Sequence, residues 1–151
     1  MPIYLVQHGL ALPAEVDPNR PLSSEGRGDV QRIAEYLRKA GVAVGKVCHS
    51  GKLRAKETAE VFAGQIGEGG VYQVGGMRPN DNVREFAAGL EEDNTLYAGH
   101  LPHLERLVSY LTTGDENAGV VEFVNGGVVC MEKDNTGYHI EWYLRPSLCS
   151  V

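Results

Sequence analysis

Residues 3–9 read Ile3-Tyr4-Leu5-Val6-Gln7-His8-Gly9, a short apolar run that ends in an amide, an imidazole and a glycine. A continuous apolar run predicts a strand buried on both faces, as in parallel sheets covered by helices on each side. A second predicted strand, Thr95 to Ala98, runs into Gly99-His100-Leu101-Pro102. Ligands bind beyond the carboxyl ends of the strands in such sheets, so we expect His8 and His100 at the functional edge.

Helical patterns alternate with short strands along the chain. The predicted strands are Ile3 to Val6, Val44 to His49, Val71 to Val74 and Thr95 to Ala98. Between and after them, four predicted helices have apolar faces formed by Val30, Ile33 and Leu37; by Leu53, Phe62 and Ile66; by Val83 and Phe86; and by Leu104 and Leu107. Ser23 or Ser24 is expected to cap the first helix and Ser50 the second. This alternation predicts an α/β fold with a mostly parallel central sheet and helices on both faces.

The C-terminal part has a different pattern. Val128 to Glu132 and Tyr138 to Leu144 flank the turn-rich Asp134-Asn135-Thr136-Gly137, which predicts an antiparallel hairpin. Tyr138, Ile140, Trp142 and Leu144 alternate, so we expect them on one face of a strand. The chain has 151 residues without repeats or low-complexity tracts, and we expect a single domain over residues 1–151.

Composition excludes several classes of protein. The 14 Lys and Arg against 20 Asp and Glu leave a formal net charge of −6, which disfavours nucleic-acid binding. No apolar stretch approaches the roughly 20 residues of a membrane span, and the N-terminal residues lack the features of a signal peptide. The cysteines, Cys48, Cys130 and Cys149, have no metal-type spacing. We therefore expect a cytoplasmic protein with free thiols, no metal site and no membrane contact.

Four residues would suit phosphoryl chemistry if the fold brings them together: His8, Arg20, Arg54 and His100. A guanidinium group matches phosphate oxygens with two parallel hydrogen bonds and stays charged. A neutral imidazole nitrogen can attack phosphorus and form a phosphohistidine. A second histidine can donate a hydrogen bond to the phosphoryl oxygens in the transition state. Such a site needs no metal.

These residues lie in segments that resemble one known family. Gln7-His8-Gly9 resembles the Arg-His-Gly signature of the histidine phosphatase (phosphoglycerate mutase-like) superfamily. Three further segments resemble motifs of its small bacterial SixA-type branch. Asn19-Arg20-Pro21-Leu22-Ser23 resembles the branch's Arg-Pro-Leu-Thr segment, and residues 50–58, Ser-Gly-Lys-Leu-Arg-Ala-Lys-Glu-Thr, resemble its Ser-Pro-x-x-Arg-Ala-x-x-Thr motif. Gly99-His100-Leu101-Pro102 resembles its Ser/Gly-His-x-Pro element. The four segments come in family order and spacing, and the resemblance covers nearly the whole chain.

The resemblance implies a phosphoglycerate mutase-like fold and a phosphatase that acts without a cofactor. It implies His8 as the nucleophile, Arg20 and Arg54 as phosphate-binding groups and His100 as the partner that stabilises the phosphoryl oxygens. Gln7 and Gly9 complete the expected phosphate-binding set. The implied substrate is a phosphorylated histidine-containing transfer domain or a related small phosphorylated molecule, with inorganic phosphate or sulfate bound in the pocket.

Gln7 stands where the family has its first arginine. An amide still donates hydrogen bonds but carries no charge, and losing a charge-assisted contact costs about 1.5–3 kcal/mol. Lys52 and Arg78 are the candidates for replacement charge; if neither supplies it, the chain is a weakened enzyme or an inactive module that binds a phosphorylated ligand or partner. Asp81 is the best candidate for a proton donor to the leaving group, with an ordinary solvated loop carboxylate as the alternative.

Overall fold

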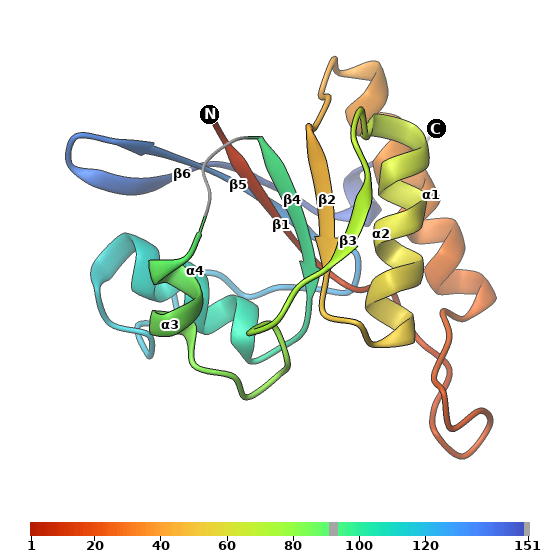
Figure 1. Ribbon diagram of the computed structural model, residues 1–151. Helices are drawn as coiled ribbons and strands as arrows, with labels where there is room; N and C mark the ends of the chain where they lie inside the picture. Colours follow the sequence, from red (N-terminus) through yellow and green to blue (C-terminus); the bar gives the residue numbers. More distant parts are fainter. Residues whose placement is uncertain (91–93, 150–151) are drawn as a thin grey trace.

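A six-stranded sheet in the order β3-β2-β4-β1-β5-β6 forms the centre of the computed structural model, which describes residues 1–90 and 94–149 (Figure 1). The strands are β1 (Ile3–Gln7), β2 (Lys46–His49), β3 (Val71–Gln73), β4 (Thr95–Gly99), β5 (Val128–Asp134) and β6 (Gly137–Leu144). The helices are α1 (Ser24–Lys39), α2 (Leu53–Ile66), α3 (Val83–Ala88) and α4 (His103–Thr113), followed by a 3₁₀ turn, η1 (Pro146–Leu148). The predicted α/β class is confirmed, with strand ends shifted by one or two residues.

The sheet is parallel from β3 through β2 and β4 to β1. β5 then runs antiparallel to β1, and β6 runs antiparallel to β5. The C-terminal hairpin predicted from the sequence is therefore present and extends one side of a mostly parallel sheet.

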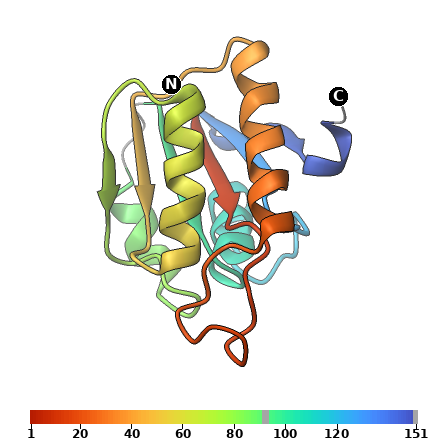
Figure 2. The same cartoon turned by 90° about the vertical axis from the view of Figure 1, so that its right-hand side faces the viewer.

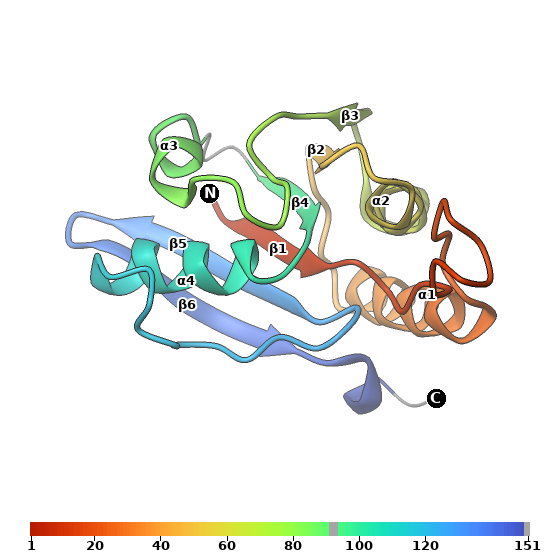
Figure 3. The same ribbon diagram turned by 90° about the horizontal axis from the view of Figure 1, so that it is seen from below.

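Helices α1 and α2 cover one face of this sheet, and α3 and α4 cover the other (Figures 2 and 3). The alternation in β1 supplies both cores: Tyr4 and Val6 pack with the first pair of helices, whereas Ile3 and Leu5 pack with the second. All four side chains are buried, as expected for a strand enclosed on both faces. No helix in the described part of the chain has the length and apolar content that crossing a bilayer requires.

The expected single apolar face of β6 is wrong. The pairing register shifts between Cys130 and Met131, so that Cys130 faces Trp142 and Met131 faces Ile140. This bulge adds one residue, Glu141, to β6 and reverses the alternation beyond it. Ile140 therefore packs into the core under α3 and α4, whereas Trp142 packs into the core under α1 and α2.

The first turn of α1 rests on the segment that follows His8. Ser23 caps the helix, as predicted, with its Oγ accepting the Gly26 N–H at 2.9 Å. Ser23 also donates its backbone N–H and its hydroxyl to the Leu10 carbonyl, at 2.9 and 3.0 Å. A Cβ on Gly26 would lie 2.0 Å from the Leu10 oxygen, so the glycine is needed for this close approach.

Two glycines in α1 make this packing testable. Gly26→Ala is expected to lower the free energy of unfolding by about 1–3 kcal/mol, because the new methyl group overlaps rigid backbone. Gly28→Ala is the matched control, since a Cβ there meets no atom within 4 Å. It is expected to stabilise by up to about 1 kcal/mol through helix propensity. Urea unfolding followed by circular dichroism measures both, and equal effects of the two substitutions would contradict this packing.

Candidate active site

The carboxyl ends of β1 and β4 place His8 and His100 side by side. The two strands pair in register up to Gln7 opposite Gly99, and the His8 N–H then donates to the Gly99 carbonyl at 3.0 Å. The imidazole centroids lie 5.1 Å apart with their planes inclined by 53°. His8 is 9% exposed and His100 is 1% exposed. The structure thus brings together the two histidines that the sequence placed at strand ends.

A hydrogen bond to the backbone fixes which His8 nitrogen is free. Nδ1 lies 2.7 Å from the Gly9 carbonyl oxygen. A carbonyl only accepts, so Nδ1 carries the proton of the neutral ring and Nε2 carries the lone pair. Nε2 is therefore the atom of His8 that can act as a nucleophile.

Gly9 links the end of β1 to helix α2. Its N–H donates to Thr58 Oγ1 at 3.0 Å and is therefore already engaged. Thr58 in turn donates its hydroxyl to the Arg54 carbonyl at 2.8 Å, which ties the turn after β1 to the first turn of α2. A Cβ on Gly9 would lie 2.7 Å from Val30 Cγ2, so the position also has no room for a side chain.

The charges of both predicted arginines, Arg54 and Arg20, lower the pKa of His8. Arg54 lies on the first turn of α2, half-buried, and its Nε has no hydrogen-bond partner among the described residues. Arg20 lies in the loop between β1 and α1 with a left-handed φ of 50° and donates its Nε–H to the Leu12 carbonyl at 3.1 Å. The positive charges of both guanidinium groups contribute to lowering the His8 pKa. The fold therefore assembles the four residues proposed for phosphoryl chemistry.

Two neighbours of this set were not assigned a part from the sequence. Glu57 accepts the Leu22 N–H with Oε1 at 2.7 Å and pairs through Oε2 with Arg27 at 3.1 Å. It thereby holds the segment that carries Arg20 against α2. Thr58 makes the bridge described above. Both residues lie in the 50–58 segment that carried the family resemblance, which was the one available signal.

Burial is the main cause of the unusual electrostatics. It lowers the pKa of His8 to about 4, with Arg54 and Arg20 adding to the shift and the bond to Gly9 opposing it. It also lowers the pKa of His100 to about 3, with the charges of His8, Arg54 and Lys52 adding to the shift. For His8, removal from water lowers the pKa more than the two arginines do. Both rings are therefore neutral near pH 7.

Gln7 is as buried as its neighbour. Its side chain is 9% exposed, and Oε1 has no hydrogen-bond partner in the described structure. Two further cations lie near these residues. The charge of Lys52 contributes to lowering the pKa of His100, and Arg78 lines a cavity together with Ser50. Either can supply part of the charge that Gln7 lacks.

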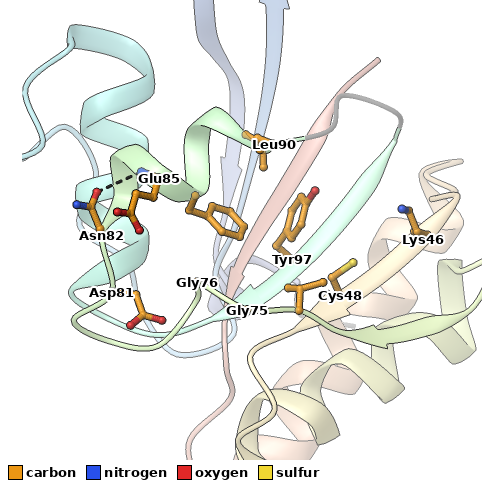
Figure 4. Close-up of a pocket in the computed structure, with 12 residues that line it drawn as sticks. Lys46, Cys48, Gly75, Gly76, Asp81, Asn82, Glu85, Leu90 and Tyr97 are labelled. Carbon is orange, nitrogen blue, oxygen red and sulfur yellow. Dashed lines mark hydrogen bonds between the residues drawn. The ribbon is translucent and has the colours of Figure 1, made fainter.

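Asp81 lines the same cavity, which measures about 470 Å³. Its Oδ2 accepts the Arg78 N–H at 2.9 Å. It also borders a second cavity of about 500 Å³ between α3 and the sheet (Figure 4), where Phe86 packs edge-on against Tyr97 at 5.5 Å. Asp81 thus shares the first cavity with Ser50, the residue that follows β2.

The remaining histidines do not join the pair. His49 accepts the Gly51 N–H at Nδ1 at 3.0 Å, and His103 is fully buried with its ring edge-on to Phe86 at 5.4 Å. His139 lies on the hairpin, 2.6 Å from a Glu141 oxygen. All three cysteines are buried free thiols. Within residues 1–90 and 94–149, no group of three His, Cys, Asp or Glu side chains is placed to hold a metal ion.

Comparison with known sequences identifies a family. Residues 3–117 match the histidine phosphatase superfamily (branch 1). An uncharacterized protein of Picosynechococcus sp. is 28% identical over 145 residues, which cover 83% of this chain and 86% of that protein.

Comparison with solved structures establishes the fold. The protein histidine phosphatase SixA complexed with tungstate superposes with a TM-score of 0.87 at 23% identity, over 99% of this chain and 100% of that chain. The alpha-ribazole phosphatase from Shigella flexneri gives a TM-score of 0.74 at 15% identity, over 93% and 95% of the two chains. The phosphoserine phosphatase from Entamoeba histolytica gives 0.72 at 13% identity, over 94% and 95%.

The protonation of His8 is directly measurable. In the folded protein His8 is expected to titrate near pH 4, against about 6.5 when the chain is unfolded. Between these values the unfolded chain binds more protons, so the free energy of unfolding falls as the pH drops from about 6.5 toward 4. NMR titration of the imidazole resonances in native and urea-unfolded protein measures both values. A His8 that titrates at or above its unfolded value in the native protein would contradict the buried, neutral site.

Proposed function

Because the chain belongs to the histidine phosphatase superfamily (branch 1), we propose that it is a metal-independent phosphatase that works through a phosphohistidine on His8. The observation that carries this proposal is the buried imidazole pair, 5.1 Å apart, on which two guanidinium groups act. A neutral nucleophile beside fixed positive charge suits an anionic phosphoryl group, whose transfer depends mainly on positioning and charge neutralisation.

In the first step, Nε2 of His8 attacks phosphorus. The P–N bond forms while the bond to the leaving group breaks, and the leaving group departs with its electron pair and takes up a proton. Asp81 is our candidate for that proton donor. Arg20 and Arg54 neutralise the phosphoryl oxygens, and His100 donates a hydrogen bond to them.

In the second step, water attacks the phosphohistidine. The P–N bond breaks, its electron pair returns to Nε2, a proton from the attacking water returns to Asp81, and orthophosphate is released. The Nδ1–H remains bonded to the Gly9 carbonyl throughout, so His8 returns to the same neutral tautomer. The cycle needs no metal ion and no cofactor.

For the substrate, we favour a phosphoramidate, namely phosphohistidine on a histidine-containing transfer domain. An imidazole leaves more readily than an alkoxide, so the protonated carboxyl group of a half-buried loop residue such as Asp81 suffices as the acid. The likeness to a protein histidine phosphatase along the full chain supports the same class. A related small phosphorylated substrate, hydrolysed by the same steps, is the other member of this proposal.

Gln7 supports a second candidate function. A buried, uncharged amide stands beside the nucleophile where the family has an arginine, and its Oε1 has no described partner. A site with one guanidinium group fewer can still bind phosphate yet fail to stabilise the transition state. The chain would then be a module that holds a phosphorylated ligand or partner without turnover.

The two candidates differ in hydrolysis. In the presence of EDTA, we expect release of orthophosphate from phosphoramidate and from a phosphorylated histidine-containing transfer domain, with vanadate as an inhibitor. His8→Ala should abolish it, whereas His139→Ala, which removes an exposed histidine on the hairpin, should leave it unchanged. Hydrolysis that persists in His8→Ala, or that requires a divalent ion, would refute the enzyme proposal.

Gln7→Arg completes the same experiment. If Gln7 is a lost phosphate contact, the added charge should raise the rate about ten- to a hundredfold. If Lys52 or Arg78 already supplies the charge, the variant gains little, and Lys52→Ala or Arg78→Ala instead costs about as much as losing a phosphate-binding arginine. If wild type and Gln7→Arg both bind orthophosphate and neither turns over, the binding module is correct.

A further inference from the structure

The sequence predicted that Ser50 caps α2, and this prediction is wrong. The helix begins at Leu53, and its N-cap residue, Lys52, makes no side-chain capping bond. The Ser50 hydroxyl instead lies 2.6 Å from Nε2 of His100. Both residues follow the ends of neighbouring parallel strands, β2 and β4, and they are 6% and 1% exposed. This short, buried hydrogen bond therefore lies beside His8, the proposed nucleophile.

The hydrogen bonds around Ser50 indicate the direction of this contact. The Lys52 N–H donates to Ser50 Oγ at 3.3 Å, so the oxygen already has a donor. The hydroxyl proton then has one acceptor in the described structure, the His100 Nε2. In the opposite direction, an Nε2–H donating to Ser50 would leave the hydroxyl proton without an acceptor. A buried donor left without a partner costs about 1–3 kcal/mol, so the first arrangement is favoured.

The direction of this bond determines the protonation of the other His100 nitrogen, Nδ1. His100 is neutral near pH 7 and holds a single ring proton. With Nε2 accepting from Ser50, that proton is on Nδ1. Nδ1 is buried and has no hydrogen-bond partner among the described residues. Unsatisfied buried donors are rare in proteins unless a ligand completes them.

We propose that Ser50 is a positioning residue that holds His100 in the Nδ1–H tautomer, so that Nδ1–H is the donor that His100 offers to the bound phosphoryl group. The inference rests on the proposed function in that His100 serves the phosphoryl oxygens. It adds which atom donates and which residue sets its protonation. The orphaned donor is then completed when the anion binds, and the ring needs no reorganisation at the moment of reaction.

Long-range ¹H–¹⁵N NMR of the imidazole nitrogens tests this without any turnover. Wild-type protein should show His100 protonated at Nδ1, with that resonance shifting when orthophosphate saturates the site. In Ser50→Ala the Nδ1–H tautomer should lose its dominance, and in Ser50→Thr, which keeps a hydroxyl, it should return. Ser109→Ala is the matched control, because Ser109 is also buried and hydrogen-bonded, to the Val120 N–H at 3.2 Å, but lies on α4.

Phosphoramidate hydrolysis provides the second readout. In Ser50→Ala we expect kcat to fall about ten- to a hundredfold, as for loss of one transition-state hydrogen bond, and KM to change less. A proton on Nε2 in wild type, an Nδ1 resonance unmoved by orthophosphate, or a Ser50→Ala protein that matches Ser109→Ala in tautomer and kcat would overturn the proposal. Protein that shows the predicted tautomers but no hydrolysis would refute the enzyme function and leave this positioning role standing.

Discussion

The parallel pairing of β1 with β4 sets the position of everything at the site. Its register carries Gln7 opposite Gly99 and continues into the bond from the His8 N–H to the Gly99 carbonyl. The imidazoles of His8 and His100 therefore follow the sheet at the same level, and both are buried with their centroids 5.1 Å apart. Burial then removes them from water, and this desolvation, more than the nearby charges, keeps both rings neutral.

The α1–α2 layer holds the charged groups against that pair. Thr58 links the Gly9 N–H to the Arg54 carbonyl, and Glu57 fastens the backbone of Leu22 to α2. Arg54 and Arg20 are thus fixed by backbone bonds of their own segments. A preorganised cluster of this kind stabilises an anion without first having to reorient its donors, which is the main requirement of phosphoryl transfer.

Patterns local in sequence predicted the fold and the placement of His8 and His100 side by side, because strands enclosed on both faces leave a plain apolar signature and end in polar residues at one edge. The failures arose where a contact between distant segments decided the outcome. Ser50 fits the pattern of a helix cap, yet its hydroxyl bonds to His100, fifty residues away. The alternation of β6 predicted one face, yet the bulge at Glu141 depends on its pairing with β5.

The central claim is that His8 becomes phosphorylated during turnover, although Gln7 leaves its neighbourhood with one charge fewer than the family pattern. The most direct measurement is rapid quenching into base during hydrolysis of phosphoramidate in EDTA, followed by tryptic digestion and mass spectrometry. The N-terminal peptide, residues 1–27, contains His8 as its only histidine. The account predicts one phosphoryl group on this peptide during turnover and none in His8→Ala. Turnover without phosphorylation of this peptide, or phosphorylation of the segment that carries His100 instead, would contradict it.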